Sequence, residues 1–234
     1  MISTRLLSLS TLSLFLWLPI ARAQAPPSKE TATVAAAIEV LDCLAGIPEK
    51  CIPPAMLCDA QAVAIVPDIL KAGFVLGGRH GHGVLLVREP GGGWSNPIFL
   101  TVTGGSVGWQ IGVQRTDLVL IFRTQRSVNR LIEGKGKFTL GADAAIAAGP
   151  VGREAAAATD AQLKAEIYSY SRSRGLFAGV SLAGDVIRVD HAANECFYNV
   201  RGAPTADIVA GRIPMIPEVA LRLRLALAKY AGVR

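Results

Sequence analysis

The sequence predicts an α+β fold: a single domain in which a meandering antiparallel β-sheet or partly closed barrel packs with N-terminal and C-terminal helices. Short apolar runs recur through the middle of the chain about every 8 to 12 residues, with glycine or aspartate between them, a spacing typical of antiparallel sheets. Towards both ends the apolar residues instead follow a helical period. These patterns place the strands in the middle of the chain and helices on either side.

The first 23 residues have the pattern of a secretory signal peptide. Arg5 precedes an apolar run over residues 6–20, and Ala21-Arg22-Ala23 fits a cleavage site with small residues around it. The run is shorter than the roughly 20 residues that a membrane-spanning helix needs. We therefore expect an exported protein, periplasmic or associated with the cell envelope after the signal peptide is removed.

The mature chain is expected to have a flexible leader over 24–33 and one domain over 34–234, which includes a C-terminal helical tail. This length is sufficient for a sizeable core. The formal net charge of +6 falls to +4 on cleavage because both charges removed are basic. So mild an excess excludes the dense basic footprint of a nucleic-acid binder, but it favours contact with anionic lipid surfaces.

Two helices are predicted ahead of the sheet. Residues 30–44 carry Val34, Ile38 and Leu41 at helical spacing, and residues 53–60 form a shorter helix with proline in its first turn. We expect both helices to pack as a lid on the sheet.

The predicted sheet consists of short strands. Glycine pairs, Pro67-Asp68 and the Arg115-Thr116-Asp117 segment are interpreted as the breaks between them. Ahead of the helical segment at 125–134, strands are predicted over 62–66, 74–76, 84–87, 98–103, 106–114 and 118–122.

Beyond the sheet's first part, helical spacing returns over residues 125–134. A β-hairpin follows, because apolar residues alternate with Ser and Arg over 167–174 and alternation resumes over 177–182. The remaining helices are predicted over 192–199 as a single turn, 205–212 and 217–230.

The hairpin also suggests a binding surface. Arg172 and Arg174 fall on one strand, and glycines interrupt its partner, so guanidinium groups would lie beside bare backbone and could hold an anionic head group. The alternative is an ordinary hairpin with a solvated basic face.

Four cysteines, Cys43, Cys51, Cys58 and Cys196, all fall in the mature chain. An even number in an exported protein favours disulfides, of which three pairings are formally open. We expect two of the first three to pair locally and the third to reach Cys196. Their spacing does not match a zinc ligand set.

Signals for catalysis are weak. His80 and His82 would share one side of an extended strand and could contribute two metal ligands, but an exposed turn is the favoured interpretation. The chain has no P-loop ending and no dinucleotide fingerprint. We therefore predict neither an enzyme nor a cofactor or metal.

Basic residues near glycines and apolar strands offer a different chemistry. Arginine contacts phosphate through its planar fork and lysine as a point charge, so such a set could seat phospholipid head groups. For each residue singly, a solvated surface role is the alternative. The predicted lipid-binding residues are Arg79, Arg123, Arg126, Lys135, Lys137, Arg153, Arg172 and Arg174.

Eight blocks stand out along the chain, at 62–67, 73–79, 93–97, 104–112, 116–120, 141–143, 149–153 and 170–179. Together they resemble the SYLF lipid-binding domain family, in the family's order and from about Val34 to Tyr198. The resemblance implies non-catalytic phospholipid binding; in eukaryotic members the ligands are phosphoinositides, some members bind actin filaments, and bacterial members are exported. The basic helix at the start of the eukaryotic domain is not matched, because residues 30–44 contain no basic side chain.

The sequence thus predicts an exported, non-catalytic protein, peripheral to the cell envelope, whose partner is a phospholipid or anionic membrane surface. A structural or protein-interaction domain without a lipid ligand is the alternative, with its protein partner unknown. A hydrolase or metal enzyme is the least favoured class.

Overall fold

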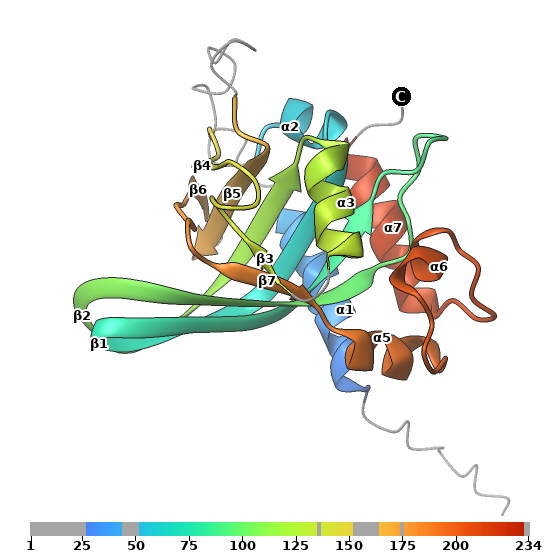
Figure 1. Ribbon diagram of the computed structural model, residues 1–234, viewed down its shortest axis with the longest axis horizontal. Coiled ribbons are helices and arrows are strands. Elements are labelled where there is room, and N and C mark those ends of the chain that lie inside the picture. The colour runs from blue at the N-terminus through green and yellow to red at the C-terminus, as the bar shows by residue number, and fades with distance from the viewer. Residues whose placement is uncertain (1–26, 44–51, 135–136, 152–163, 174–175, 232–234) are drawn as a thin grey trace, which may run out of the picture.

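The computed structural model describes residues 27–43, 52–134, 137–151, 164–173 and 176–231. The α+β class is confirmed: helices flank a strongly curled sheet (Figure 1). The helices are α1 (Lys29–Asp42), α2 (Pro54–Cys58), α3 (Gln125–Glu133), α5 (His191–Tyr198), α6 (Thr205–Val209) and α7 (Glu218–Ala231). The strands are β1 (Ala62–Val87), β2 (Ile98–Phe122), β3 (Phe138–Thr139), β4 (Ile146–Ala148), β5 (Ile167–Ser173), β6 (Leu176–Gly179) and β7 (Val186–Val189).

These strands form a sheet in the order β3-β7-β2-β5-β4, with β1 paired to β2 and β6 paired to β5. Most neighbours are antiparallel, as the sequence predicts, whereas β4 and β5 run parallel. The sheet is therefore mixed within the described part of the chain.

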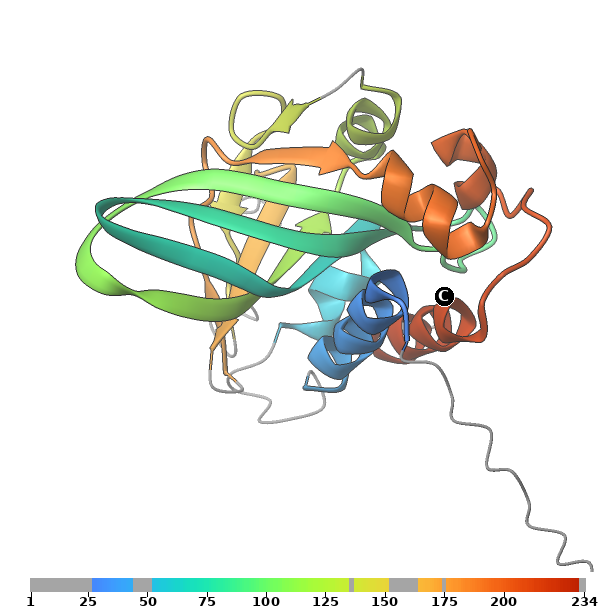
Figure 2. The same ribbon diagram turned by 90° about the horizontal axis from the view of Figure 1, so that it is seen from below.

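The longest feature is the ribbon formed by β1 and β2, which contain 26 and 25 residues. They pair from Ala62 opposite Phe122 to Leu85 opposite Ile98. One end of β2 also pairs with β5 and the other end with β7. Between these ends the ribbon curls out from the body and returns (Figures 1 and 2).

The predicted strand breaks within β1 and β2 are wrong, and the glycines explain why. A Cβ on Gly83 would lie 2.3 Å from the Ile65 carbonyl oxygen, and one on Gly81 would lie 2.8 Å from the Ile69 side chain. Glycine therefore lets the returning half of β1 lie directly on its outgoing half. Pro67 and Asp68 likewise do not end a strand; they form an irregularity in the register between Val66 and Ile69.

Helix α1 packs on the ribbon as predicted, whereas α2 and α7 pack mainly on other helices. Helix α1 packs against β1 and α7, and α2 packs against α7. Helix α3 contacts β1, β2 and β7, and Figure 2 places α1 and α3 on opposite sides of the ribbon. The segment expected to form one helical turn near residue 192 is a full helix, α5, whose N-cap Asp190 accepts a hydrogen bond from the Ala193 N–H.

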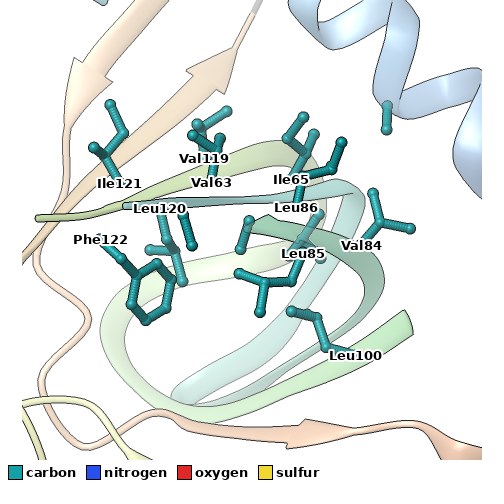
Figure 3. Packing of buried hydrophobic residues seen from close by; sticks show 14 of the residues in the cluster. Val63, Ile65, Val84, Leu85, Leu86, Leu100, Val119, Leu120, Ile121 and Phe122 are labelled. Carbon is teal, nitrogen blue, oxygen red and sulfur yellow. The ribbon is translucent and has the colours of Figure 1, made fainter. Parts of the chain in front are cut away.

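The core lies where the two ends of the ribbon meet (Figure 3). Ile65, Leu85, Leu120 and Phe122 are almost fully buried, together with Leu41 of α1. Burying one such side chain stabilises the fold by roughly 1.5 to 3 kcal/mol, so this cluster fixes the ribbon register and with it every surface described below.

The β5–β6 hairpin is confirmed, but its glycine does not offer bare backbone to a ligand. Gly179 lies opposite Tyr170, and a Cβ there would be 2.5 Å from the Gly149 carbonyl oxygen. The Gly149 backbone thus occupies the space where a side chain of residue 179 would lie. In the strand register, Arg172 pairs with Phe177 and not with a glycine.

The cysteine pairing differs from the expected one at Cys196. Cys58 and Cys196 are free thiols: the Cys58 thiol donates to the Ala231 carbonyl at 2.7 Å, and Cys196 lies 3.6 Å from a Glu30 carboxylate oxygen. Glu30 raises the pKa of the Cys196 thiol, mainly through its charge. Cys51 and the signal peptide lie outside the described residues, so export stays a prediction.

Candidate functional site: a cationic groove beside helix α1

An open groove of about 550 Å³ lies between the first turns of α1 and the curled ribbon. Helix α1 contributes Lys29, Ala32 and Thr33, and the ribbon contributes Leu70 and Arg115, which are direct partners across β1 and β2. Because side chains alternate along a strand, His80 and His82 can both line the groove on the ribbon side. The groove thus combines cations with apolar surface.

A chain of polar contacts crosses one end of this groove. Lys29 Nζ lies 3.3 Å from His82 Nε2, and His80 Nε2 lies 3.4 Å from the same nitrogen. An ammonium group can only donate, so this contact assigns the lone pair of His82 to Nε2 and its proton to Nδ1. Nδ1 faces Asp190 Oδ2 at 3.7 Å, which suits that tautomer.

The surroundings of His82 favour its neutral form. Partial burial lowers the pKa of His82, the charge of Lys29 and the neighbouring His80 lower it further, and Asp190 acts in the opposite direction. The imidazole is therefore uncharged at neutral pH and gains its proton only under acidic conditions.

Two fixed cations remain available in the groove. Arg115 and Lys29 are both exposed, and within the described residues neither forms an ion pair with a carboxylate. Leu70 beside them keeps 40% of its surface exposed, which is unusual for a large aliphatic side chain in this molecule. Asp68 supplies the acidic group of the groove lining.

Arg172, a predicted head-group ligand, has a different position. Its Nε and Nη2 both contact Asp117 Oδ2, and its Nη1 contacts the Cys43 sulfur at the end of α1. Asp117 Oδ1 in turn accepts the Asp68 N–H at 3.0 Å, at the register shift of the ribbon. Asp68 has a φ of 49°, so this bond holds an uncommon backbone conformation. Arg172 fixes the fold next to the groove and is not a free cation.

Arg79 is also paired, on the other face of the ribbon. Its Nη1 lies 3.2 Å from Asp185 Oδ2, and the two side chains are only 16% and 2% exposed. The remaining described members of the predicted set, Arg123, Arg126 and Lys137, lie on or beside α3.

The predicted cations are therefore divided among three places and do not converge on one surface. Helix α3 lies across the ribbon from helix α1 (Figure 2). Arg79 is half-buried on the other face of the ribbon, and Arg172 is paired with Asp117. Lys135, Arg153 and Arg174 lie outside the described residues.

The sequence prediction missed the groove because its members are far apart along the chain. Lys29 and Arg115 meet only when α1 packs on the ribbon, and the direct pairing of Leu70 with Arg115 depends on continuous strands. The alternation that places His80 and His82 on one side was the single local signal for this surface.

Among the described residues, the histidine pair has no further metal ligands beside it. Within the described ranges, no group of three or more His, Cys, Asp or Glu side chains has a geometry that could hold a metal ion. In the same part of the chain, every helix is too short or too polar to cross a membrane.

These features define an α+β domain with a curled two-stranded ribbon and an open cationic groove, a form suited to binding. A family model described as "Las17-binding protein actin regulator" matches residues 103–230, more than half of the chain. The chain therefore belongs to the Ysc84 family, which confirms the resemblance to the SYLF domain drawn from the sequence. No solved structure was found to match it.

Curated relatives are named as binding or SH3-containing proteins. LAS seventeen-binding protein 3 of Saccharomyces cerevisiae is 38% identical over 86% of this chain and 43% of its own length. SH3 domain-containing YSC84-like protein 1 of Xenopus laevis is 37% identical over 71% of this chain and 49% of its own. The human protein of the same name is 36% identical over 71% and 48%. The chain thus spans less than half the length of these relatives.

Proposed function

We propose that this chain is an exported, non-catalytic protein that binds phospholipid at the surface of the cell envelope, with anionic head groups held in the α1 groove. The observation that carries the proposal is the pair of exposed cations, Lys29 and Arg115, which have no carboxylate partner among the described residues and lie beside the exposed Leu70. Cations that already have a carboxylate partner contribute little to an incoming phosphate, whereas these two keep their full charge for it.

The groove also suits the layered chemistry of a bilayer surface. A head-group phosphate would contact Lys29 and Arg115, while Leu70 and the alanine face of α1 would lie against the first apolar atoms. A cation near an anionic membrane surface contributes about 1 kcal/mol. Binding should therefore be reversible, peripheral and sensitive to salt.

Vesicle flotation tests the proposal directly. The protein should float with phosphatidylglycerol vesicles and not with phosphatidylcholine vesicles, and added salt should weaken binding. The double variant Lys29→Gln, Arg115→Gln loses two surface charges, so we expect its affinity to fall by about 2 kcal/mol, or roughly 30-fold.

The matched control is Arg126→Gln with Lys137→Gln, which removes two exposed cations from the α3 side of the molecule. It should retain the affinity of the unmodified chain. Equal losses in the two double variants would mean that only net charge matters, and the groove assignment would then be abandoned.

A second candidate is protein interaction through the outer face of α7. Leu225 is 71% and Leu221 42% exposed, one helical turn apart, and both fall within the family-matched residues. If this face docks a protein, the unmodified chain should capture that protein from envelope extract in the absence of lipid. The double variant Leu221→Ser, Leu225→Ser should no longer capture it. Unchanged capture would remove α7 from consideration.

A further inference from the structure

A second cavity, of about 140 Å³, lies on the ribbon face opposite the α1 groove. The alternation of β1 divides the two sites: Leu70 and His80 line the groove, whereas Ile69, Lys71 and Arg79 line the cavity. Strand β5 and the segment after β6 form the far wall. The two sites share a ribbon but no lining residue.

The cavity is apolar on one side. Ile69, Leu118 and Leu182 are each at most 5% exposed, and Val180 is half-buried beside them. At about 30 Å³ for a water-sized group, 140 Å³ holds roughly five such groups. That is enough for a carboxylate and a few methylenes, and too small for a complete phospholipid head group.

On its other side the cavity is cationic. Lys71 and Arg79 are the charged side chains among its lining residues, and none of the described carboxylates lines it. Lys71 is exposed at the rim, and within the described residues it forms no ion pair. An incoming anion would therefore meet a free ammonium group at the entrance.

Arg79, deeper in the cavity, is poorly satisfied by its own partner. Its Nε is buried without a hydrogen-bond partner, and Asp185 Oδ2, which it approaches at 3.2 Å, is buried without one as well. Burial raises the pKa of Asp185 to about 6 despite the nearby guanidinium. A buried donor without a partner is unfavourable, so the Arg79 guanidinium is incompletely satisfied by Asp185 and would gain from a further acceptor oxygen.

From this geometry we infer that the cavity binds the anionic end of a single-chain amphiphile of the alkyl carboxylate class. The carboxylate lies between Lys71 and Arg79, and the first methylenes pack against Ile69, Leu118 and Leu182. The rest of a longer chain leaves past the exposed Lys71 and Gln114 at the rim. This site is separate from the groove and does not depend on phospholipid binding there.

Isothermal titration of the full chain with octanoate tests the inference, with octanol as the neutral chain and inorganic phosphate as the anion without a chain. Octanoate should bind at least tenfold more tightly than either, because only octanoate uses both walls. Octanol binding as tightly as octanoate, or phosphate doing so, would overturn the carboxylate assignment.

Two variants locate the site without removing the half-buried Arg79. Lys71→Gln should weaken octanoate about fivefold, and Val180→Phe, which fills the cavity from its half-buried edge, should abolish binding while the chain stays folded by circular dichroism. Lys29→Gln with Arg115→Gln should leave octanoate binding unchanged. Octanoate binding that survives Val180→Phe, or that disappears in the groove variant, would place the ligand elsewhere.

Discussion

The two faces of the β1–β2 ribbon carry similar cations in opposite states. On the α1 face, Lys29 and Arg115 are exposed and have no carboxylate partner among the described residues, whereas on the other face Arg79 is half-buried against Asp185. Arg172 lies on the α1 side but is paired with Asp117. Availability of a cation is thus decided by which carboxylates the folded strands bring to it, and not by the basic residue itself.

The largest effect should come from breaking the paired state. Arg172→Ala would leave Asp117 buried without its cation and would loosen the bond that holds the Asp68 N–H. Removing one partner of such a pair costs about 3 to 5 kcal/mol, so we expect the free energy of unfolding in urea to fall by about 4 kcal/mol.

Arg126→Ala serves as the control for this loss, because Arg126 is exposed on α3 and a surface change there should stay within about 0.5 kcal/mol. If Arg172→Ala unfolds like the unmodified chain but no longer floats with anionic vesicles, Arg172 is a lipid ligand after all.

The opposite face can be probed through Asp185. Its pKa is raised to about 6 from an ordinary value near 3.8 by burial. Between these two values the unfolded chain loses the proton before the folded chain does, so stability falls as pH rises from about 4 to 6 and then levels off. A shift of about two pKa units corresponds to about 3 kcal/mol.

Urea unfolding of the unmodified chain and of Asp185→Asn at pH 4.5 and pH 7 isolates this contribution. The unmodified chain should lose more stability than the variant over this interval, because the amide does not titrate. Parallel profiles for the two proteins would show that Asp185 is solvated or more strongly paired with Arg79 than its buried position indicates.

The returning half of β1 lies directly on its outgoing half at Gly83. A substitution of this glycine tests that close approach. A Cβ at position 83 would meet the Ile65 carbonyl at 2.3 Å and the Val66 Cα at 2.8 Å, both backbone atoms that cannot turn aside. Gly83→Ala should therefore destabilise the chain by about 2 kcal/mol. Gly91→Ala is the matched control, since a Cβ at that position would have nothing within 4 Å, and it should unfold like the unmodified chain.

These glycines also mark the limit of the sequence prediction. Helical periodicity was sufficient to locate α1, α3 and α7, because each has one buried face. The same sequence could not show that Gly81 and Gly83 sit inside a strand, since their neighbours Ile65 and Ile69 lie earlier in β1 and meet them only after the ribbon has curled.

The candidate site was harder to predict for the same reason. The arginines were chosen for their position beside glycines, but the carboxylates that neutralise them, Asp117 and Asp185, come from other strands or loops. Arg115 and Lys29 have no such partner within the described residues, and no local pattern distinguishes them from the others. Which cations meet a carboxylate depends on the strand register of the folded sheet. The sequence pattern did not determine that register.

On the α1 face, protonation of His82 should have a small effect on lipid binding. His82 faces Lys29, His80 and Asp190, and its pKa is lowered by burial first and then by its cationic neighbours. Acidification adds a proton to the groove lining, and one further charge should strengthen binding to phosphatidylglycerol vesicles by about 1 kcal/mol, or about fivefold. Flotation at pH 5.5 and pH 7.5 measures the change.

His82→Gln should remove most of this pH dependence while keeping the binding measured at pH 7.5, because the unmodified imidazole is already neutral there. Phosphatidylcholine vesicles should show no response to pH with either protein. If the variant strengthens on acidification as much as the unmodified chain, His82 is not the responsive group, and His80→Gln then tests the other imidazole of the groove. A response that survives in both variants would place the responsive group outside the groove, with the exposed cations around α3 as the next surface to test.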